Sequence, residues 1–248
     1  MPSPNESVSV DVTERGADRD GQPQVMDRRL FMQLLVFDVA RDRSPESALA
    51  ALRAALERRG AAAVIYEDVS NPRGLGLLTW SEEPAHFVTT VRAAVNDPEA
   101  SGLTLNPAFT MFGRSYSSGH EPNLEQALLE RPRVTATNPA WPWAIWYPLR
   151  RTGSFERLEG RDKGAILREH AVIGRAYGAA DLAHDVRLVS HGLDARDNEF
   201  IIGLIGKSLH PLSHVVQTMR RTRQTSEFIA QMGPFFVGRA AWQSTGGG

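Results

Sequence analysis

Apolar residues gather in short runs along the chain, and between these runs lie longer stretches in which apolar and polar residues mix at helical spacing. Short apolar runs bounded by turn residues are typical of buried strands, and longer amphipathic stretches are typical of helices. The pattern predicts strands at 29–40, 61–69, 75–80, 109–117, 142–151, 184–190, 199–206 and 234–242. It predicts helices at 44–60, 84–95, 162–177 and 209–223.

Local signals mark the first helix and the first pair of strands. Ser44 can cap the helix, Pro45 stands at its first position and Gly60 ends it. The turn sequence SNPRG stands between 61–69 and 75–80, so these two strands are expected to pair antiparallel.

Both halves of the chain have the order β-α-β-β-α-β, which is the ferredoxin-like unit. Two such units can pair their sheets edge to edge, with the helix-free faces turned toward each other and the helices outside. The predicted fold class is therefore α+β, with tandem ferredoxin-like repeats that form a dimeric α+β barrel within one chain. We expect such a barrel to enclose a pocket.

The chain divides into five predicted segments. They are a mobile tail at 1–26, an N-terminal repeat at 27–120, a connector at 121–141, a C-terminal repeat at 142–243 and a short tail at 244–248. The first segment is rich in Pro, Ser, Asp and Gly with almost no aromatic residues, which indicates mobility. A connector of this length is expected to cover a site or to make subunit contacts.

Composition excludes several classes of function. The 248 residues include 28 basic and 29 acidic ones, so no overall charge draws the molecule to nucleic acid or to an anionic membrane. The chain has no cysteine, which excludes disulfides and thiolate ligands. No signal peptide and no membrane-spanning run is recognisable, and a cytoplasmic location is predicted.

The segment ILREHAVIGRAYG, at 166–178, places His170 shortly before Gly174 and Gly178 on a predicted helix. Glycine weakens a helix interior by about 0.5–1 kcal/mol relative to alanine. We therefore expect something to approach the backbone closely here, either another element of the protein or a flat ligand.

Three pieces of the second half carry a family resemblance. They are WYPLRR (146–151), EHAVIGRAYG (169–178) followed by the turn HGLD (191–194), and MRRTRQTSEF with MGPFFVG (219–238). In order and spacing they resemble the chlorite dismutase family of haem proteins, and in particular its coproheme decarboxylase branch. The resemblance implies a duplicated ferredoxin-like barrel, a haem b or coproheme in the C-terminal repeat, hydrogen peroxide or another small oxidant as a partner, and a homopentamer.

The resemblance assigns His170 as the proximal iron ligand and Tyr147 as the residue that is oxidised to a radical and attacks a propionate. A haem ligand needs a neutral imidazole whose second nitrogen is held by an acceptor. Without the resemblance, His170 would simply pack or face water. Tyr147 would be a core tyrosine in an aromatic-rich strand.

The resemblance also implies residues that hold the porphyrin: Arg151, Gly174, Arg220, Arg221 and Ser226. Arginine pairs well with carboxylates such as propionates. Arg220 and Arg221 compete for one anchoring position, and charge runs of this kind are otherwise solvated surfaces.

Two positions beside the iron differ from the family pattern. Gln224 stands where the family often has an acidic residue next to the proximal histidine, and Glu227 could replace it. The residue on the distal side of the iron is located by its spacing in the family pattern. Counted back from the HGLD turn it is Asp185, and counted forward from His170 it is Ala183. His184, between them, could act as an acid or base for peroxide, or could be an exposed strand residue. No arginine fits either count, which argues against chlorite as the substrate.

The leading functional prediction is peroxide-dependent oxidative decarboxylation of coproheme to haem b. The alternatives are a haem-binding or haem-handling protein, or a weak haem peroxidase, without decarboxylase activity. A barrel that has lost the porphyrin and acts as an interaction module is a further alternative.

Overall fold

The computed structural model describes residues 10–244, and its elements follow the two predicted repeats. The first repeat consists of β3 (Phe31–Val39), α1 (Pro45–Arg58), β4 (Ala63–Asp68), β5 (Gly74–Ser81), a π-helical turn (Phe87–Val91) continued by α2 (Arg92–Val95), and β7 (Met111–Arg114). The second consists of β8 (Trp143–Arg151), α5 (Gly160–Ala179), β9 (His184–Val189), β10 (Phe200–Gly206), α6 (Leu209–Met219) and β12 (Phe236–Gln243). Both repeats therefore have the predicted order.

Smaller elements that the sequence pattern does not predict complete the structure. They are β1 (Glu14–Arg15), β2 (Val25–Met26), β6 (Leu103–Leu105), α4 (Gly153–Glu156), α7 (Arg223–Phe228), β11 (Ile229–Met232) and two short 3-10 turns (Pro98–Ala100 and Pro107–Phe109). The helix predicted at 209–223 ends early, at Met219, because Thr222 caps a separate helix, α7, by accepting a hydrogen bond from the backbone N–H of Thr225.

The predicted signals at the first helix are confirmed. The hydroxyl of Ser44 accepts a hydrogen bond from the Ser47 N–H at 3.1 Å, and Pro45 is the first helical residue. Gly60 follows the helix with φ of 63°, a conformation that glycine adopts without steric cost. The strands β4 and β5 pair antiparallel, as the turn between them predicts.

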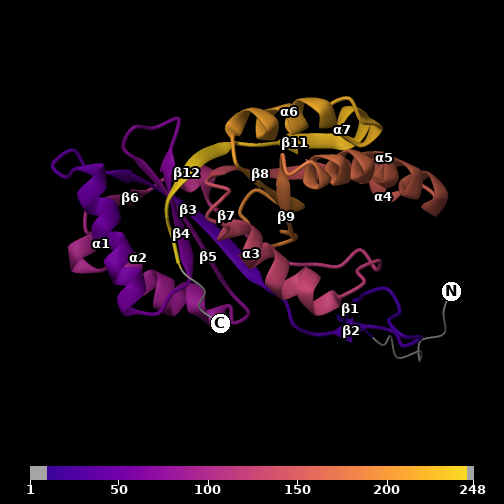
Figure 1. The fold of residues 1–248 in the computed structure, drawn as a ribbon, viewed down its shortest axis with the longest axis horizontal. Helices are drawn as coiled ribbons and strands as arrows, with labels where there is room; N and C mark the ends of the chain where they lie inside the picture. Colours follow the sequence, from indigo (N-terminus) through magenta and orange to yellow (C-terminus); the bar gives the residue numbers. More distant parts are fainter. Residues whose placement is uncertain (1–9, 245–248) are drawn as a thin grey trace.

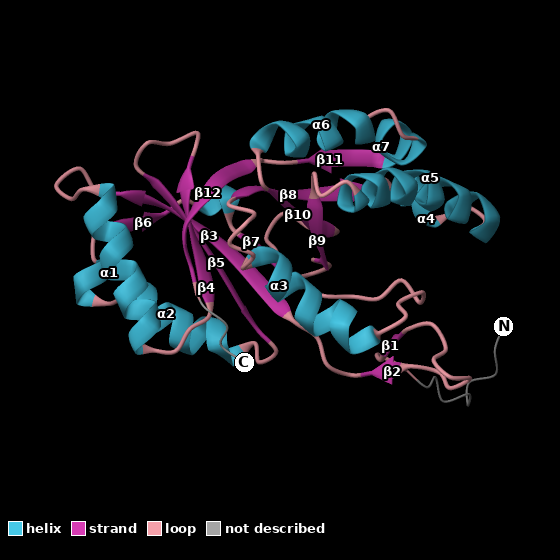
Figure 2. Ribbon diagram, viewed as in Figure 1, coloured by secondary structure: helices cyan, strands magenta, loops and turns pink. Residues whose placement is uncertain are grey.

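The strands close into a barrel in the order β7-β3-β5-β4-β12-β8-β10-β9, with β9 pairing back to β7. The two repeats meet edge to edge at the pairs β4–β12 and β7–β9. Helices lie on the outside: α1 and α2 beside the first repeat, and α5, α6 and α7 beside the second (Figure 1). Figure 2 shows the strands between these two groups of helices.

The barrel interior is filled with side chains, so the prediction of an enclosed pocket is wrong. The small gap lined by Met32, Leu78 and Trp146 leaves ≈ 0 Å³ for a water molecule. Trp146 lies against Gly203, where an added Cβ would be 2.6 Å from the indole ring. An eight-stranded barrel is only wide enough for its own side chains, which explains the filled interior.

The connector is largely helical. A π-helical turn (Gln126–Glu130) continues into α3 (Arg131–Ala136), which packs against β9. Leu128, Leu129 and Ala136 point into the core of the molecule. The connector thus covers one end of the second repeat.

Part of the predicted N-terminal tail forms a ribbon in which β1 pairs with β2, close to the connector (Figure 1). The Gln24 side chain accepts a hydrogen bond from the Leu124 N–H at 3.0 Å, and the Glu14 carboxylate pairs with Arg114 at 3.1 Å. Residues 10–26 thus have defined partners, and their mobility stays a prediction. Residues 1–9 and 245–248 of the two predicted tails lie outside the described residues. Within residues 10–244, no helix is long and apolar enough to cross a membrane.

Candidate functional site

The candidate site lies on the outer face of the second repeat's sheet, under the helices. Along β8, Ile145, Tyr147 and Leu149 point toward α5 and α6, whereas Trp146 points into the barrel. This alternation follows from the pleat of the strand. The candidate site therefore lies between the sheet and the helices, not in the barrel interior.

Tyr147 is buried on this face, with 7% of its surface exposed. Its ring stacks on Phe235 with 4.6 Å between ring centres. Burial, and to a lesser extent the charge of Asp185, raises the pKa of the Tyr147 hydroxyl, while Arg220 opposes this shift. The phenol therefore keeps its proton across the physiological range.

The helix α5 covers the site but packs loosely. Of its 20 residues only Ile166 is fully buried, and Ile173 and Tyr177 contact the core only in part. A Cβ added at Gly174 would meet only the Met219 Cε, at 3.8 Å, and one added at Gly178 only the Ala183 carbonyl oxygen, at 3.9 Å. These are ordinary contact distances. Close approach by another element is therefore excluded within the described residues, and the flat-ligand alternative remains.

His170 lies on α5 and is half-buried. Its Nδ1 atom is shielded from solvent and has no hydrogen-bond partner among the described residues. Burial lowers the pKa of His170, and the charge of Arg187 adds to this effect, while Asp185 and Glu169 oppose it. The imidazole is therefore neutral at neutral pH, which is the form that binds metals.

The two residues predicted to support His170 differ in orientation. Gln224 is turned inward on α7, and its Oε1 atom is buried with no partner within residues 10–244. Glu227 pairs with Arg223 at 3.0 Å on the surface, where both side chains are about half exposed. Gln224 is therefore the candidate that the structure brings to the buried side of α7.

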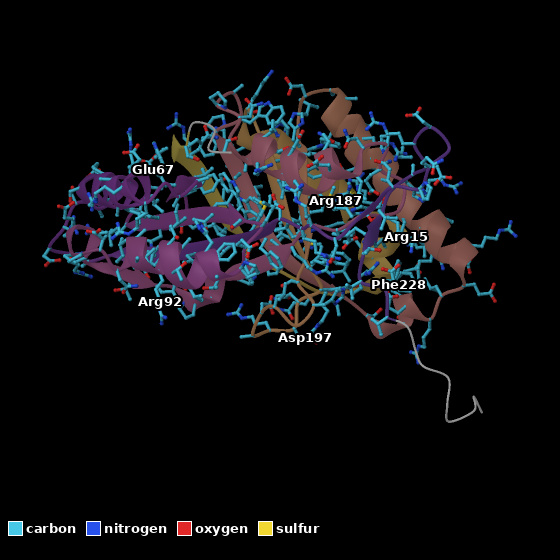
Figure 3. All side chains as sticks on the ribbon, turned by 90° about the horizontal axis from the view of Figure 1, so that it is seen from below. Arg15, Glu67, Arg92, Arg187, Asp197 and Phe228 are labelled. Carbon is cyan, nitrogen blue, oxygen red and sulfur yellow. The ribbon has the colours of Figure 1, made fainter. Side chains whose placement is uncertain are left out.

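Side chains of a strand alternate between its two faces, and Val186 and Leu188 on β9 point into the barrel. Asp185 and Arg187 therefore project to the outer face. The Asp185 carboxylate accepts a hydrogen bond from Arg131 Nη2 at 2.5 Å and forms an ion pair with Arg187, whose Nε lies 2.8 Å from Asp185 Oδ2. Charges of both Asp185 and Arg187 act on His170. Figure 3 labels Arg187 near the middle of the molecule.

Arg187 is a residue near His170 that the sequence analysis missed, because its charge acts on the imidazole and neither count pointed to it. The counts from His170 and from the HGLD turn pointed only to Ala183 and Asp185. Side chains two residues apart on a strand lie on the same face, so Arg187 lies on the face of Asp185. Arg187, Arg131, Asp185 and Tyr116 help to line a cavity of about 50 Å³ at this end of β9. Arg187 is paired with Asp185, and the exclusion of chlorite as the substrate stays a prediction.

His184 is not brought to this face. Its Nε2 atom lies 2.8 Å from Asp181 Oδ1, and its ring stacks on Trp141 with 3.5 Å between centres. As the immediate neighbour of Asp185 on the strand, it points to the opposite side of the sheet. Ala183 is buried in the core between the sheet and α6.

Of the predicted porphyrin anchors, Arg151 is already paired. Its guanidinium binds the Glu199 carboxylate through Nε, at 3.0 Å to Oε1 and 3.1 Å to Oε2, and lies over the rings of Phe155 and Phe200. Burial would raise the pKa of Glu199, but the hydrogen bonds from Arg151 lower it overall. A propionate would have to compete with this carboxylate.

The remaining anchors lie on or next to α7. Ser226 donates its hydroxyl to the Thr222 carbonyl at 3.0 Å, within the helix. Arg220 and Arg221 are exposed, and neither has a carboxylate partner within 4.0 Å among the described residues. Arg220 is the one whose charge acts on Tyr147, so it lies toward the site.

Fold and site together define a class. The chain is a tandem ferredoxin-like barrel in which one repeat presents a neutral imidazole and a buried tyrosine between its helices and its sheet. The sequence profile described as chlorite dismutase matches residues 46–241. The chain belongs to the chlorite dismutase family.

Solved structures share the fold at low sequence identity. A haem-binding protein from Thermus thermophilus is 20% identical, with a TM-score of 0.68 over 86% of this chain and 91% of that one. Chlorite dismutase from Candidatus Nitrospira defluvii, in complex with imidazole, is 16% identical, with a TM-score of 0.67 over 86% of this chain and 91% of that one. No curated protein matches the sequence.

Proposed function

We propose that the chain binds an iron porphyrin between α5 and the outer face of β8 and β9, and that His170 is the residue that would hold the iron. The observation that carries this proposal is the neutral, half-buried imidazole of His170 on a helix whose inner surface is open at Gly174. A porphyrin would supply four nitrogen ligands of its own to iron, so one protein nitrogen would suffice. The haem-binding relative from Thermus thermophilus supports the same ligand class.

The residues around His170 fit this role. Two buried polar atoms lack partners on the packed helices α5 and α7, namely Nδ1 of His170 and Oε1 of Gln224. They are complementary, because Nδ1–H donates and the amide oxygen accepts. A hydrogen bond between them would fix the tautomer and leave Nε2 for iron. A neutral amide oxygen would accept a weaker hydrogen bond from the N–H than a carboxylate does.

The more specific proposal is peroxide-dependent decarboxylation of coproheme, with Tyr147 as the reacting residue. When bound, the iron porphyrin supplies the oxidising power in the presence of peroxide. Tyr147 lies on the helix-covered face of the sheet, where the porphyrin is proposed to bind, and holds its proton. Oxidation of a buried phenol requires a proton acceptor, and Asp185 is the carboxylate whose charge acts on Tyr147. Arg220 would bind a propionate, since it has no carboxylate partner among the described residues.

A second candidate is haem binding or handling without turnover. It is favoured by the Arg151–Glu199 pair, which occupies the proposed propionate anchor, and by the neutral Gln224 beside His170. The homopentamer and the cytoplasmic location implied at the sequence level stay predictions. Light scattering of the purified protein would test the first.

Haem binding is tested by titrating ferric haem b and iron coproporphyrin into wild type, His170→Ala and the exposed-histidine control His120→Ala. We expect a shifted Soret band in wild type and His120→Ala, and an altered spectrum in His170→Ala. Identical spectra for all three proteins would show that His170 does not bind iron.

Decarboxylation is tested by adding peroxide to the coproporphyrin complexes and measuring the mass of the porphyrin. Wild type should lose one or two carboxyl groups, and Tyr147→Phe should bind the porphyrin without this loss. An unchanged mass in wild type would leave binding without turnover as the function.

A further inference from the structure

A second cluster of polar side chains lies on α6, outside the porphyrin site. His210 and His214 are one helical turn apart, both exposed, with 5.9 Å between ring centres. Tyr177 reaches them from α5, where its hydroxyl contacts His214 Nδ1 and lies 3.1 Å from the Thr218 hydroxyl. No function assigned above uses this cluster.

The hydrogen bonds of the cluster have one possible direction. The Thr218 hydroxyl donates to the His214 carbonyl at 2.9 Å, because a carbonyl can only accept. Its single proton is then used, so Tyr177 must donate to Thr218. The single proton of Tyr177 is used in turn, so His214 must donate from Nδ1 to the Tyr177 oxygen.

This chain of bonds fixes the tautomer of His214. With the proton on Nδ1, the neutral ring has its lone pair on Nε2. Metal-binding histidines show this arrangement, in which the second ring nitrogen donates to a fixed acceptor that orients the ring. Histidines at positions i and i+4 of a helix lie on one face and can bind the same ion.

The spacing of the two rings suits one shared ion. Zinc–nitrogen bonds of about 2.0–2.1 Å in tetrahedral geometry place two imidazole centres roughly 5–6 Å apart. The observed separation of 5.9 Å lies in this range. A positive charge beside the two histidines would repel a metal ion. Lys207 precedes His210 by three residues, but it is paired with Asp181, which balances its charge.

We propose that His210 and His214 form a binding site for a divalent transition metal ion, of the type Zn²⁺, Ni²⁺ or Cu²⁺, with Tyr177 as a positioning residue. Imidazole is a suitable ligand for these ions, and the chain has no cysteine to compete for them. Among the described residues no third histidine or carboxylate completes the group, so water fills the remaining positions.

The site would connect two helices of the candidate porphyrin site. Tyr177 follows His170 by seven residues, or two turns, so both lie on the same face of α5. A metal ion held on α6 through His214 therefore strengthens a contact with the helix that carries His170. The proposal does not depend on porphyrin binding.

The test is a calorimetric titration of Zn²⁺, Ni²⁺ and Cu²⁺ into the full chain without an affinity tag. We expect one saturable site per chain, tightest for Cu²⁺, that is lost in His210→Ala and in His214→Ala. Tyr177→Phe should weaken it by about tenfold, the usual effect of removing the group that orients a ligating histidine. The control His120→Ala should bind as wild type does.

Two results would overturn the proposal. One is the absence of saturable binding, or binding that survives in His210→Ala or His214→Ala. The other comes from nitrogen NMR of the neutral His214 ring, which should show the proton on Nδ1; a proton on Nε2 contradicts the hydrogen-bond direction. Because the mutated histidines are exposed, unchanged circular dichroism is expected and confirms that the variants are folded. Unchanged affinity in Tyr177→Phe would remove Tyr177 from the site.

Discussion

Burial sets the protonation of the two central residues of the candidate site. The imidazole of His170 and the phenol of Tyr147 are both held in their neutral forms, because desolvation penalises a charge. Asp185, which lies nearby, forms ion pairs with two arginines. The site at neutral pH therefore offers a free imidazole lone pair on one element and a fixed carboxylate on another.

The lowered pKa of His170 predicts how stability depends on pH. Below the ordinary value of 6.5 the unfolded chain binds a proton that the folded chain excludes, so the unfolding free energy falls as the pH decreases. The contribution of the neutral His170 ring to the unfolding free energy is fully present above pH 6.5. Between about pH 7.5 and 5.5, the urea midpoint of wild type should fall by more than that of His170→Asn, which lacks the titrating ring. His120→Asn, an exposed control, should stay parallel to wild type; parallel curves for His170→Asn would contradict the prediction.

The Arg151–Glu199 pair predicts a large loss of stability on a small change. The two side chains are only 12% and 11% exposed, so Glu199→Gln leaves a nearly buried guanidinium with only the exposed Glu156 carboxylate, at 3.2 Å, as a charge partner. The expected loss is about 3 kcal/mol in chemical denaturation. The matched control is Glu227→Gln, which breaks the half-exposed pair with Arg223 and should cost less than about 1 kcal/mol. Equal effects of the two substitutions would refute the structural role of Arg151.

At the scale of elements, α5 is the unusual one. Its inner face is incompletely buried although the helix has 20 residues and carries His170. By contrast α1, with 14 residues, buries Ala48, Leu52, Ala55 and Leu56. Most helices gain their stability by packing one apolar face, so an open inner face indicates a ligand surface.

Gly174 on α5 allows a direct test of that interpretation. Gly174→Ala should stabilise the ligand-free protein by about 0.5–1 kcal/mol, since the new methyl group has room beside Met219. The same substitution should weaken porphyrin binding if the ligand packs against this turn. Gly164→Ala is the control, because no atom lies within 4 Å of its added Cβ. It should raise thermal stability without changing the affinity in a haem titration. Equal affinities for both variants would show that the porphyrin does not contact Gly174.

The whole molecule depends on both repeats for one core. Residues from each half fill the barrel together, among them Leu34 and Leu78 from the first and Trp146 and Phe236 from the second. The edges are also shared, because β4 pairs with β12 and β7 with β9. A single repeat would expose an apolar face and two unpaired edges.

Separated halves should therefore fail to fold. We expect the fragments 10–120 and 121–244, expressed alone, to show no cooperative thermal transition by circular dichroism, whereas the full chain unfolds cooperatively. The reason is the loss of half of the shared core together with exposed strand edges. A sharp transition in either fragment would contradict the shared-core description.

The element order and the fold class were predictable because the strand and helix patterns repeat in both halves. The position of the site was not. The strand β8 is buried on both faces, so its sequence has no clear alternation to show that Tyr147 points to the helices and Trp146 into the barrel. His184 and Asp185 are neighbours in the sequence, but the pleat sends them to opposite faces.

The sequence by itself determined the two repeats, their caps and turns, and the motifs around His170, because these depend on local propensity and on hydrophobic period. Only the tertiary structure decided that the barrel is filled, that Arg151 pairs with Glu199, and that Arg187 lies beside Asp185 on the outer face of β9. Those outcomes depend on barrel closure and on which face of a strand meets a helix, and both are set by contacts between residues far apart in the chain.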